Sequence, residues 1–153
     1  MAAEALTGRC GLYCGACSVY RAQRDDGEYL KGLAERFNCP PEKVRCEGCG
    51  ALTPECWGYD CGIVQCSVAK GYRFCHECGE FEDRTCDKYE KLDKGYLEND
   101  NVDIRKNLET IKSGNINEWL KLSTERFRCP NCLGPLPTGA TQCHNCRVKF
   151  PMV

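Results

Sequence analysis

The sequence has no long apolar run. No stretch of its 153 residues approaches the roughly 18 to 20 apolar positions that a membrane-spanning helix needs. Residues 1–9 also lack the apolar core of a secretory signal peptide. Together these absences predict a cytoplasmic protein that has no membrane segment.

Histidine is scarce as well, with only two in the whole chain. His76 and His144 each lie inside a C-x-x-C pair, where a side chain usually points away from a bound ion. This argues against a histidine-ligated zinc site with an open coordination position. It also argues against a histidine-activated nucleophile of the kind found in cysteine proteases. We therefore lean against an enzyme and assign no catalytic residue.

Apolar side chains are few once cysteine is set aside. The apolar fraction of 42% counts cysteine, and without the 16 cysteines it falls to about 31%. A small domain with so little apolar area needs disulfide or metal cross-links. In a reducing cytoplasm, close cysteine pairs bind metal rather than each other, and a disulfide scaffold is the alternative.

Cysteine is what the sequence has in excess. Twelve of the 16 cysteines precede residue 87, and the other four lie within residues 129–146. Several form C-x-x-C pairs, which can hold one tetrahedral ion from a single tight turn. The distribution predicts a cysteine-rich metal-binding domain (1–95), a helical connector (96–126) and a zinc-ribbon module (127–153).

The C-terminal module reads C-P-N-C, then ten residues rich in glycine and proline, then C-H-N-C. Each C-x-x-C turn can direct backbone N–H groups at its sulfurs, and the gap lets the second turn fold back on the first. Cys129, Cys132, Cys143 and Cys146 are therefore expected to close one tetrahedral site. The segment resembles the short zinc-ribbon modules at the ends of many bacterial and archaeal proteins, although Arg147 replaces their usual glycine. This resemblance implies β zinc-ribbon knuckles.

The most specific motif is C-G-L-Y-C-G-A-C at residues 10–17. Its glycines let the backbone curl so that the thiolates converge. A C-x-x-x-C-x-x-C spacing also occurs in radical enzymes that bind a four-iron cluster and S-adenosylmethionine. Those enzymes need a large α/β barrel, and this chain is too short and shows no alternation of strands and helices.

This motif is followed by C-E-G-C at 46–49, single cysteines at 61 and 66, C-H-E-C at 75–78, and Phe81 and Cys86. The series resembles a family of uncharacterised cysteine-rich proteins, the domain of unknown function thirty-seven ninety-five, over about residues 10–89. Ser18 stands where family members commonly have proline. The resemblance implies a metal-binding domain, with zinc the expected metal, and no established activity.

We expect ten metal ligands in this domain: Cys10, Cys14, Cys17, Cys46, Cys49, Cys61, Cys66, Cys75, Cys78 and Cys86. The last four are close enough in sequence to form one local site. The pair at 46 and 49 would take its partners from the first motif or from the cysteine at 61. Cys39 and Cys56 stand outside these pairs and are expected to be buried structural thiols.

Helices are expected over residues 18–23, where basic residues suit the C-terminal end, and over residues 28–37, where the apolar side chains share one face. A short helix between metal ligands is expected over residues 62–70. A further helix is expected to run to about residue 112 from a cap at Asp100 or Asn101. The fold class is therefore a small, metal-stabilised, mainly α protein with irregular loops.

The last predicted helix begins at Asn115, with Glu118 placed three residues later as in a capping box. Its apolar face, which includes Trp119, is expected to pack on the N-terminal domain. The alternative is a partner-binding surface centred on Trp119.

Three functions fit these observations. The first is a zinc-binding, non-enzymatic interaction or adapter module with a protein partner, and the second is an iron or iron–sulfur redox protein. The third is nucleic-acid binding through the basic flank of the ribbon, where Phe127 and Phe150 lie among arginine and lysine residues. The formal net charge of −1 would fall to about −9 with four tetrathiolate zinc sites, which argues against broad attraction to nucleic acid.

Overall fold

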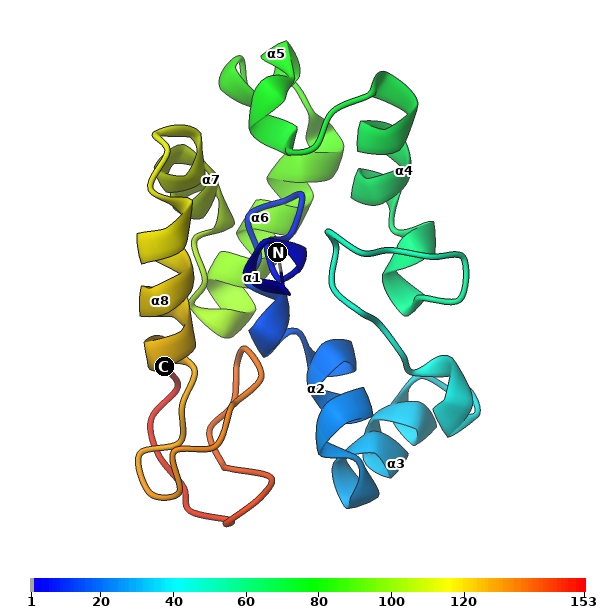
Figure 1. The fold of residues 1–153 in the computed structure, drawn as a ribbon, viewed down its shortest axis with the longest axis vertical. Coiled ribbons are helices and arrows are strands. Elements are labelled where there is room, and N and C mark those ends of the chain that lie inside the picture. The colour runs from blue at the N-terminus through cyan, green and yellow to red at the C-terminus, as the bar shows by residue number, and fades with distance from the viewer. Residues whose placement is uncertain (1) are drawn as a thin grey trace.

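The structure is a computed structural model that describes residues 2–153. It consists mainly of helices joined by irregular loops, which confirms that part of the predicted fold class (Figure 1). The helices are α1 (Ala2–Ala5), α2 (Ser18–Asp25), α3 (Gly27–Arg36), α4 (Gly62–Lys70), α5 (Gly79–Glu82), α6 (Asp87–Asp100), α7 (Ile104–Lys112) and α8 (Ile116–Arg126). Short 3-10 turns cover Cys14–Ala16, Pro41–Lys43, Trp57–Asp60 and Cys75–Glu77.

Helices α2, α3 and α4 lie close to the predicted ranges, but one predicted cap is wrong. The N-cap of α7 is Asp103, whose carboxylate accepts from Lys106 N at 2.9 Å. Asn101 instead adopts a left-handed conformation (φ 55°) that ends α6. Asn115 is the N-cap residue of α8, as predicted, but its side chain makes no cap bond with the helix, and its amide donates instead to Ser113 Oγ at 3.1 Å.

Helix α6, with 14 residues, was not predicted from the sequence. Its inward face carries Tyr89, Leu92 and Tyr96, which follow one another at helical spacing and join the main hydrophobic core. The helix packs against α4 and α7. The expected domain boundary between residues 95 and 96 therefore falls inside a helix whose side chains belong to one core.

The main core is built around Tyr13 of the first cysteine motif. Its ring stacks on Phe127 with centroids 6.2 Å apart and meets the edge of Trp119 at 6.3 Å. Its hydroxyl hydrogen-bonds Thr124 Oγ1 at 3.1 Å. Trp119 is only 6% exposed, so the prediction that α8 packs on the N-terminal domain is confirmed. The alternative prediction, a partner-binding surface centred on Trp119, is wrong because this side chain is buried.

The backbone of the first motif is held by several elements. An antiparallel bridge joins Thr7 to Tyr13, and the Tyr89 hydroxyl donates to Cys10 O at 2.8 Å. Asn107 Nδ2 of α7 donates to Gly11 O at 2.9 Å. The motif therefore lies at the centre of the fold, with α6, α7 and α8 packed around it.

The C-terminal module lacks the predicted β-knuckles. Within residues 2–153 it carries two isolated antiparallel bridges, Arg128 to Pro135 and Gln142 to Lys149, and no strand. Proline cannot donate to a strand ladder, and the module has three prolines between residues 130 and 137. Inside the two C-x-x-C turns, the N–H groups of Asn131 and Asn145 donate to sulfur, as predicted, and so they are not available to a strand ladder.

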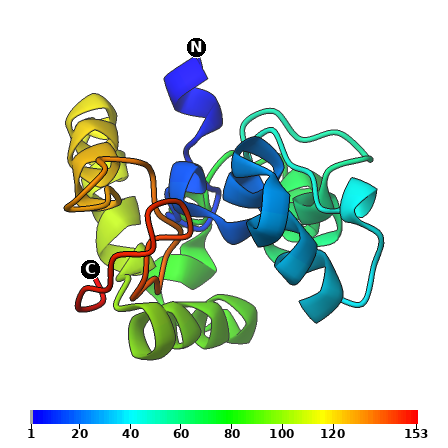
Figure 2. The same cartoon turned by 90° about the horizontal axis from the view of Figure 1, so that it is seen from below.

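The module packs against the helical part of the chain, as Figure 2 shows from below. Thr138 N donates to Ala16 O at 2.8 Å, and its hydroxyl donates to Asp100 at the end of α6. Near the chain end, Arg126 of α8 donates to Val153 O at 3.2 Å. The C-terminal module, residues 127–153, which we call the ribbon from here on, is therefore attached both to the first motif and to the helical connector.

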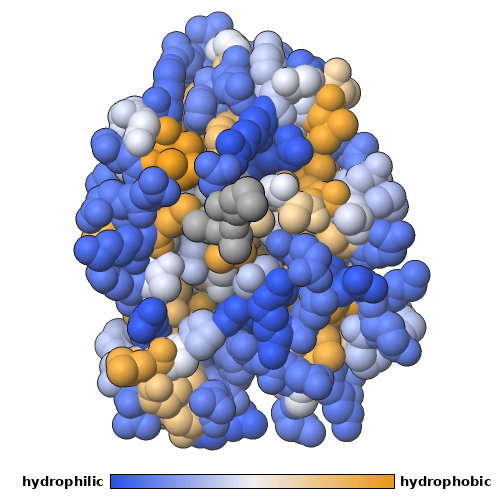
Figure 3. All heavy atoms as spheres, in the orientation of Figure 1, coloured by the Kyte–Doolittle hydropathy of each residue, from blue (hydrophilic) through white to orange (hydrophobic). Residues whose placement is uncertain are grey.

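The face shown in Figure 3 is mainly hydrophilic, with scattered hydrophobic patches. Among the helices of residues 2–153, none combines the length and the apolar character that a membrane crossing requires.

Candidate metal centres

The four ribbon cysteines converge on one point. All four sulfurs lie within 4.8 Å of one another, and they form the one group of three or more potential ligand atoms that meets this limit within residues 2–153. The Cys129 and Cys146 sulfurs are 3.5 Å apart, and those of Cys132 and Cys143 are 3.7 Å apart. Sulfurs at about 2.3 Å from a tetrahedral ion would be about 3.8 Å from each other, so the quartet has the size of a zinc site.

Hydrogen bonds in the ribbon favour thiolates over thiols. Asn131 N donates to Cys129 Sγ at 3.4 Å, and Asn145 N donates to Cys143 Sγ at 3.4 Å. A hydrogen bond from the Asn131 side chain and one from the Val148 backbone lower the pKa of Cys146 to about 6. Burial raises the pKa of Cys143 to about 11. A cation at the centre would stabilise all four as thiolates.

His144 lies inside the second C-x-x-C turn but faces away from the sulfurs. Its Nε2 is 2.8 Å from Asp25 Oδ2 at the end of α2, and its ring stacks on Tyr29 of α3 at 4.4 Å. The residue therefore attaches the ribbon to the α2–α3 pair. His76, in the other C-x-x-C turn, stacks on Phe74 at 5.4 Å.

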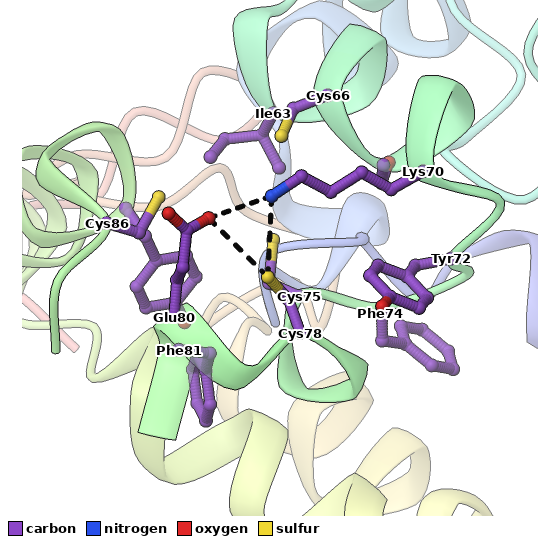
Figure 4. A pocket seen from close by; sticks show the side chains of 12 residues that line it. Ile63, Cys66, Lys70, Tyr72, Phe74, Cys75, Cys78, Glu80, Phe81 and Cys86 are labelled. Carbon is purple, nitrogen blue, oxygen red and sulfur yellow. Dashed lines mark hydrogen bonds and ion pairs between the residues drawn. The ribbon is translucent and has the colours of Figure 1, made fainter. Parts of the chain in front are cut away.

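A second group of four cysteines lines a small cavity that is open to solvent on one side, which we call the α4–α6 cavity. Cys66 comes from α4, Cys75 begins the following 3-10 turn and Cys78 is its C-cap, and Cys86 is the N-cap of α6 (Figure 4). The volume of the cavity is about 30 Å³, enough for a single ion or a water molecule. Burial and the neighbouring thiols raise the pKa of Cys75 to about 12.

A lysine and a glutamate lie beside this cysteine group. Lys70 Nζ is 3.5 Å from Cys78 Sγ and 2.8 Å from Glu80 Oε2, as the dashed lines of Figure 4 mark. The hydrogen bonds to Glu80 and Cys78 raise the pKa of Lys70, so the ammonium stays charged. A fixed positive charge at this position would offset part of the negative charge of a tetrathiolate site.

The two C-x-x-C pairs of the first part of the chain meet at Cys14 and Cys49. Cys49 N donates to Cys14 Sγ at 3.4 Å. The hydrogen bond between their side chains raises the pKa of Cys14 and lowers that of Cys49 to about 7, a pattern in which a thiol donates to a thiolate. Cys46 belongs to the apolar cluster between α2 and α3, and Cys17 packs against that cluster. Residues 14, 17, 46 and 49 therefore lie in one region, although no three of their sulfurs are within 4.8 Å of one another.

Beside this group is a larger opening, which we call the N-terminal cavity. Its volume is about 580 Å³, and Cys10, Cys17, Cys49 and Cys61 all line it. Its other walls are mostly apolar or aromatic, and Trp57, which stacks on Phe37 at 4.7 Å, forms part of one of them. Burial raises the pKa of Cys10 well above that of a free thiol.

The two cysteines that were not expected to bind metal lie in or beside a second apolar cluster between α2 and α3. Cys56 is 5% exposed, and its sulfur accepts from Thr53 N at 3.5 Å. Cys39 is half-buried at the edge of the same cluster, which also contains Cys46. All 16 cysteines of the chain carry free thiols.

The family model described as protein of unknown function (DUF3795) matches residues 6–91. The chain belongs to this family. The match covers more than half of the sequence and includes every cysteine that precedes residue 87, whereas the ribbon lies outside it. No curated protein and no solved structure matches the chain.

Sequence reasoning missed the cations beside the DUF3795 cysteines. Arg9 lies beside Cys49 and raises the positive potential there, which is one cause of that thiol's lowered pKa. Lys70 reaches the α4–α6 cavity from the end of α4. The position of Arg9 next to the first cysteine is the one hint that the sequence offered. Nothing in the spacing of Lys70 could have pointed to Cys78.

Proposed function

We propose that this DUF3795 protein binds several zinc ions and acts as a non-enzymatic interaction or adapter module. The observation that carries the proposal is the ribbon quartet, whose sulfur separations of 3.5 and 3.7 Å fit a tetrahedral ion. With four protein ligands, such a site has no open position for a substrate. Bound zinc would cross-link the chain and contribute directly to its folding energy.

Two further ions fit the N-terminal domain in this proposal. One would be held in the α4–α6 cavity by residues 66, 75, 78 and 86, with Lys70 as a charge partner. The other would be held by the cysteines at 14, 17, 46 and 49, with Cys10 and Cys61 on the wall of the N-terminal cavity. The sulfurs of these groups are spaced more widely than those of the ribbon, so binding would draw them together.

Metal analysis of the purified full chain tests the proposal. We expect colourless protein with zinc in near-whole-number equivalents. Cys143→Ser should remove one equivalent, because a three-thiolate remnant of the ribbon holds zinc more weakly. The matched control Cys39→Ser should keep every equivalent, since that residue lies outside all three groups. Iron in place of zinc, or unchanged zinc in Cys143→Ser, would contradict the proposal.

An iron–sulfur protein is the second candidate, and the N-terminal cavity is the observation that favours it. A multi-iron cluster needs more room than a single ion, and four cysteines line this opening of about 580 Å³. Anaerobic purification followed by iron and acid-labile sulfide analysis distinguishes the two functions. Neither element should be present if the domain binds zinc alone, whereas a brown protein that loses its colour in Cys10→Ser would establish the cluster.

A protein partner fits the ribbon region better than a nucleic acid. Phe127 is 4% exposed and therefore not available to stack on a base. Arg126 donates to Asn101 O and Val153 O, and Arg128 donates to Thr124 O, so two of the basic side chains already have intramolecular partners. Absence of binding to single-stranded nucleic acid at low salt is the expected result, and salt-sensitive retention would contradict this preference.

A further inference from the structure

A third cavity lies between α1, the start of the first motif and the turn after Cys46. We propose that it binds a small oxyanion, such as a phosphate or carboxylate group. We call it the oxyanion cavity. Its volume is about 500 Å³, and the residues that matter here are Glu4, Thr7, Arg9, Cys49 and Arg73, all of which line it. It shares Arg9 and Cys49 with the N-terminal cavity, so the two openings lie on either side of one wall.

The first supporting observation is a buried hydroxyl. Thr7 is 2% exposed, and its Oγ1 has no hydrogen-bond partner among residues 2–153. The backbone around it is fixed, because Thr7 bridges to Tyr13 and its N–H donates to Glu4 O at 3.2 Å. An unpaired buried hydroxyl costs stability, and Thr7 is one of the residues that line the cavity, so a ligand oxygen that reached this hydroxyl would remove that cost.

The second observation is the guanidinium of Arg9. Its hydrogen bonds to Tyr72 O at 2.8 Å and to Ser67 Oγ at 3.4 Å both use Nη1, which holds the side chain against the end of α4. Its Nε is buried and has no partner within residues 2–153. The guanidinium is thus oriented before any ligand binds, with an N–H donor left over, and arginine donors match the geometry of carboxylate and phosphate oxygens.

The lining carries two guanidinium groups, those of Arg9 and Arg73, against the Glu4 carboxylate and the Cys49 sulfur, so net charge alone does not select an anion. Arg73 brings a second guanidinium, whose Nη2 is 3.6 Å from the carboxylate of Glu4. Both side chains of that pair are about half exposed, so the pair is weak and can rearrange. Glu4 makes no contact with the free Nε of Arg9 or with the Thr7 hydroxyl. An incoming oxyanion with several oxygens could bind both of these donors and share Arg73.

The hydroxyl gives a test that separates binding from folding. Thr7→Val keeps the shape of the side chain but removes the unpaired oxygen, so the melting temperature of the variant should stay the same or rise. Its affinity for an oxyanion should fall by about tenfold or more, since the lost hydrogen bond is to a charged acceptor. Thr7→Ser keeps the hydroxyl and should bind within about threefold of the parent chain.

The experiment titrates the metal-loaded full chain with inorganic phosphate and, separately, with acetate, by calorimetry. Arg73→Gln should weaken binding, and the matched control Arg36→Gln, which removes an exposed arginine outside the cavity, should not. The anion that binds more tightly identifies the class of ligand. Metal content is measured for each variant, so that loss of zinc is not mistaken for loss of the anion site. Absence of binding by both anions, or equal binding by Thr7→Val and the parent chain, would overturn the proposal.

Discussion

Gly11, in the first cysteine motif, packs so closely against helix α7 that no residue with a Cβ atom fits at this position. Its φ is +96°, and a Cβ added there would lie 2.3 Å from Ile104 O and 2.9 Å from Leu108 Cγ of α7. The carbonyl of Ile104 is helical backbone and cannot move away alone. Gly11→Ala must therefore displace α7 from the motif that carries Cys10 and Cys14.

Gly114 offers a matched control for this substitution. Its φ is +90°, nearly the same, but an added Cβ would meet nothing within 4 Å. Gly114→Ala therefore costs only the backbone strain of an L-residue at positive φ, about 1–2 kcal/mol. Gly11→Ala carries the same strain plus the cost of overpacking, about 1–3 kcal/mol more. The bond from Asn107 to Gly11 O is also at risk, which adds about 1 kcal/mol if it breaks.

Denaturant unfolding of the metal-loaded chains measures this difference. We expect Gly11→Ala to be less stable than Gly114→Ala by about 1–4 kcal/mol, or roughly 2–4 °C in melting temperature for each kcal/mol. Its zinc content should fall as well, because the motif supplies ligands. If the two variants unfolded within about 0.5 kcal/mol of each other, the close approach of the motif to α7 would be refuted.

Three further results are expected. Trp119→Ala should destabilise the chain by about 3–5 kcal/mol in thermal unfolding. The control Leu122→Ala, on the exposed face of α8, should cost less than about 0.5 kcal/mol. Equal effects of the two substitutions would place Trp119 outside the core. His144→Ala should speed hydrogen exchange in the ribbon without releasing its zinc, since the contact is to α2 and α3 rather than to the ion; loss of zinc would make it a ligand. In zinc-stripped protein at pH 7, Cys146, with a pKa of about 6, is mostly thiolate and Cys143, with a pKa of about 11, is not. Mass spectrometry should therefore find that iodoacetamide modifies Cys146 before Cys143, and the reverse order would contradict the hydrogen bonds assigned to Cys146.

Local signals in the sequence were enough to predict much of the helical structure. Helix α4 begins and ends at the predicted residues, with Cys61 as its N-cap and Gly71 in a left-handed conformation at its C-cap, and both of these features are local. Helix α6 escaped because its charged residues outnumber its apolar ones and Gly95 interrupts it. Its inward stripe has meaning only once Tyr89 and Tyr96 are seen to pack beneath the first motif.

Of the candidate sites, too, those made of residues close in sequence could be predicted and those assembled by the fold could not. The ribbon quartet could be predicted because its ligands span fewer than 20 residues and two tight turns bring them together. The convergence of Cys14 with Cys49 depends on how the α2–α3 pair folds between them, which the spacing alone does not contain. The orientation of Arg9 is set by its bond to Tyr72 O, 63 residues away, and Lys70 reaches Cys78 only because the chain turns back after α4, so neither contact follows from helical spacing.

Metal binding and folding therefore depend on each other differently at the ribbon and at the first motif. The ribbon holds its sulfurs at ion-binding distance with hydrogen bonds from its own turns, so the site needs little from the rest of the chain. The first motif does not have that independence. Its backbone is held by Tyr89, Asn107 and the bridge to Thr7, and its sulfurs face cysteines from later segments. Metal bound there would stabilise the same contacts that bring its ligands together, and so the helical core and the N-terminal sites would form or be lost as one cooperative unit.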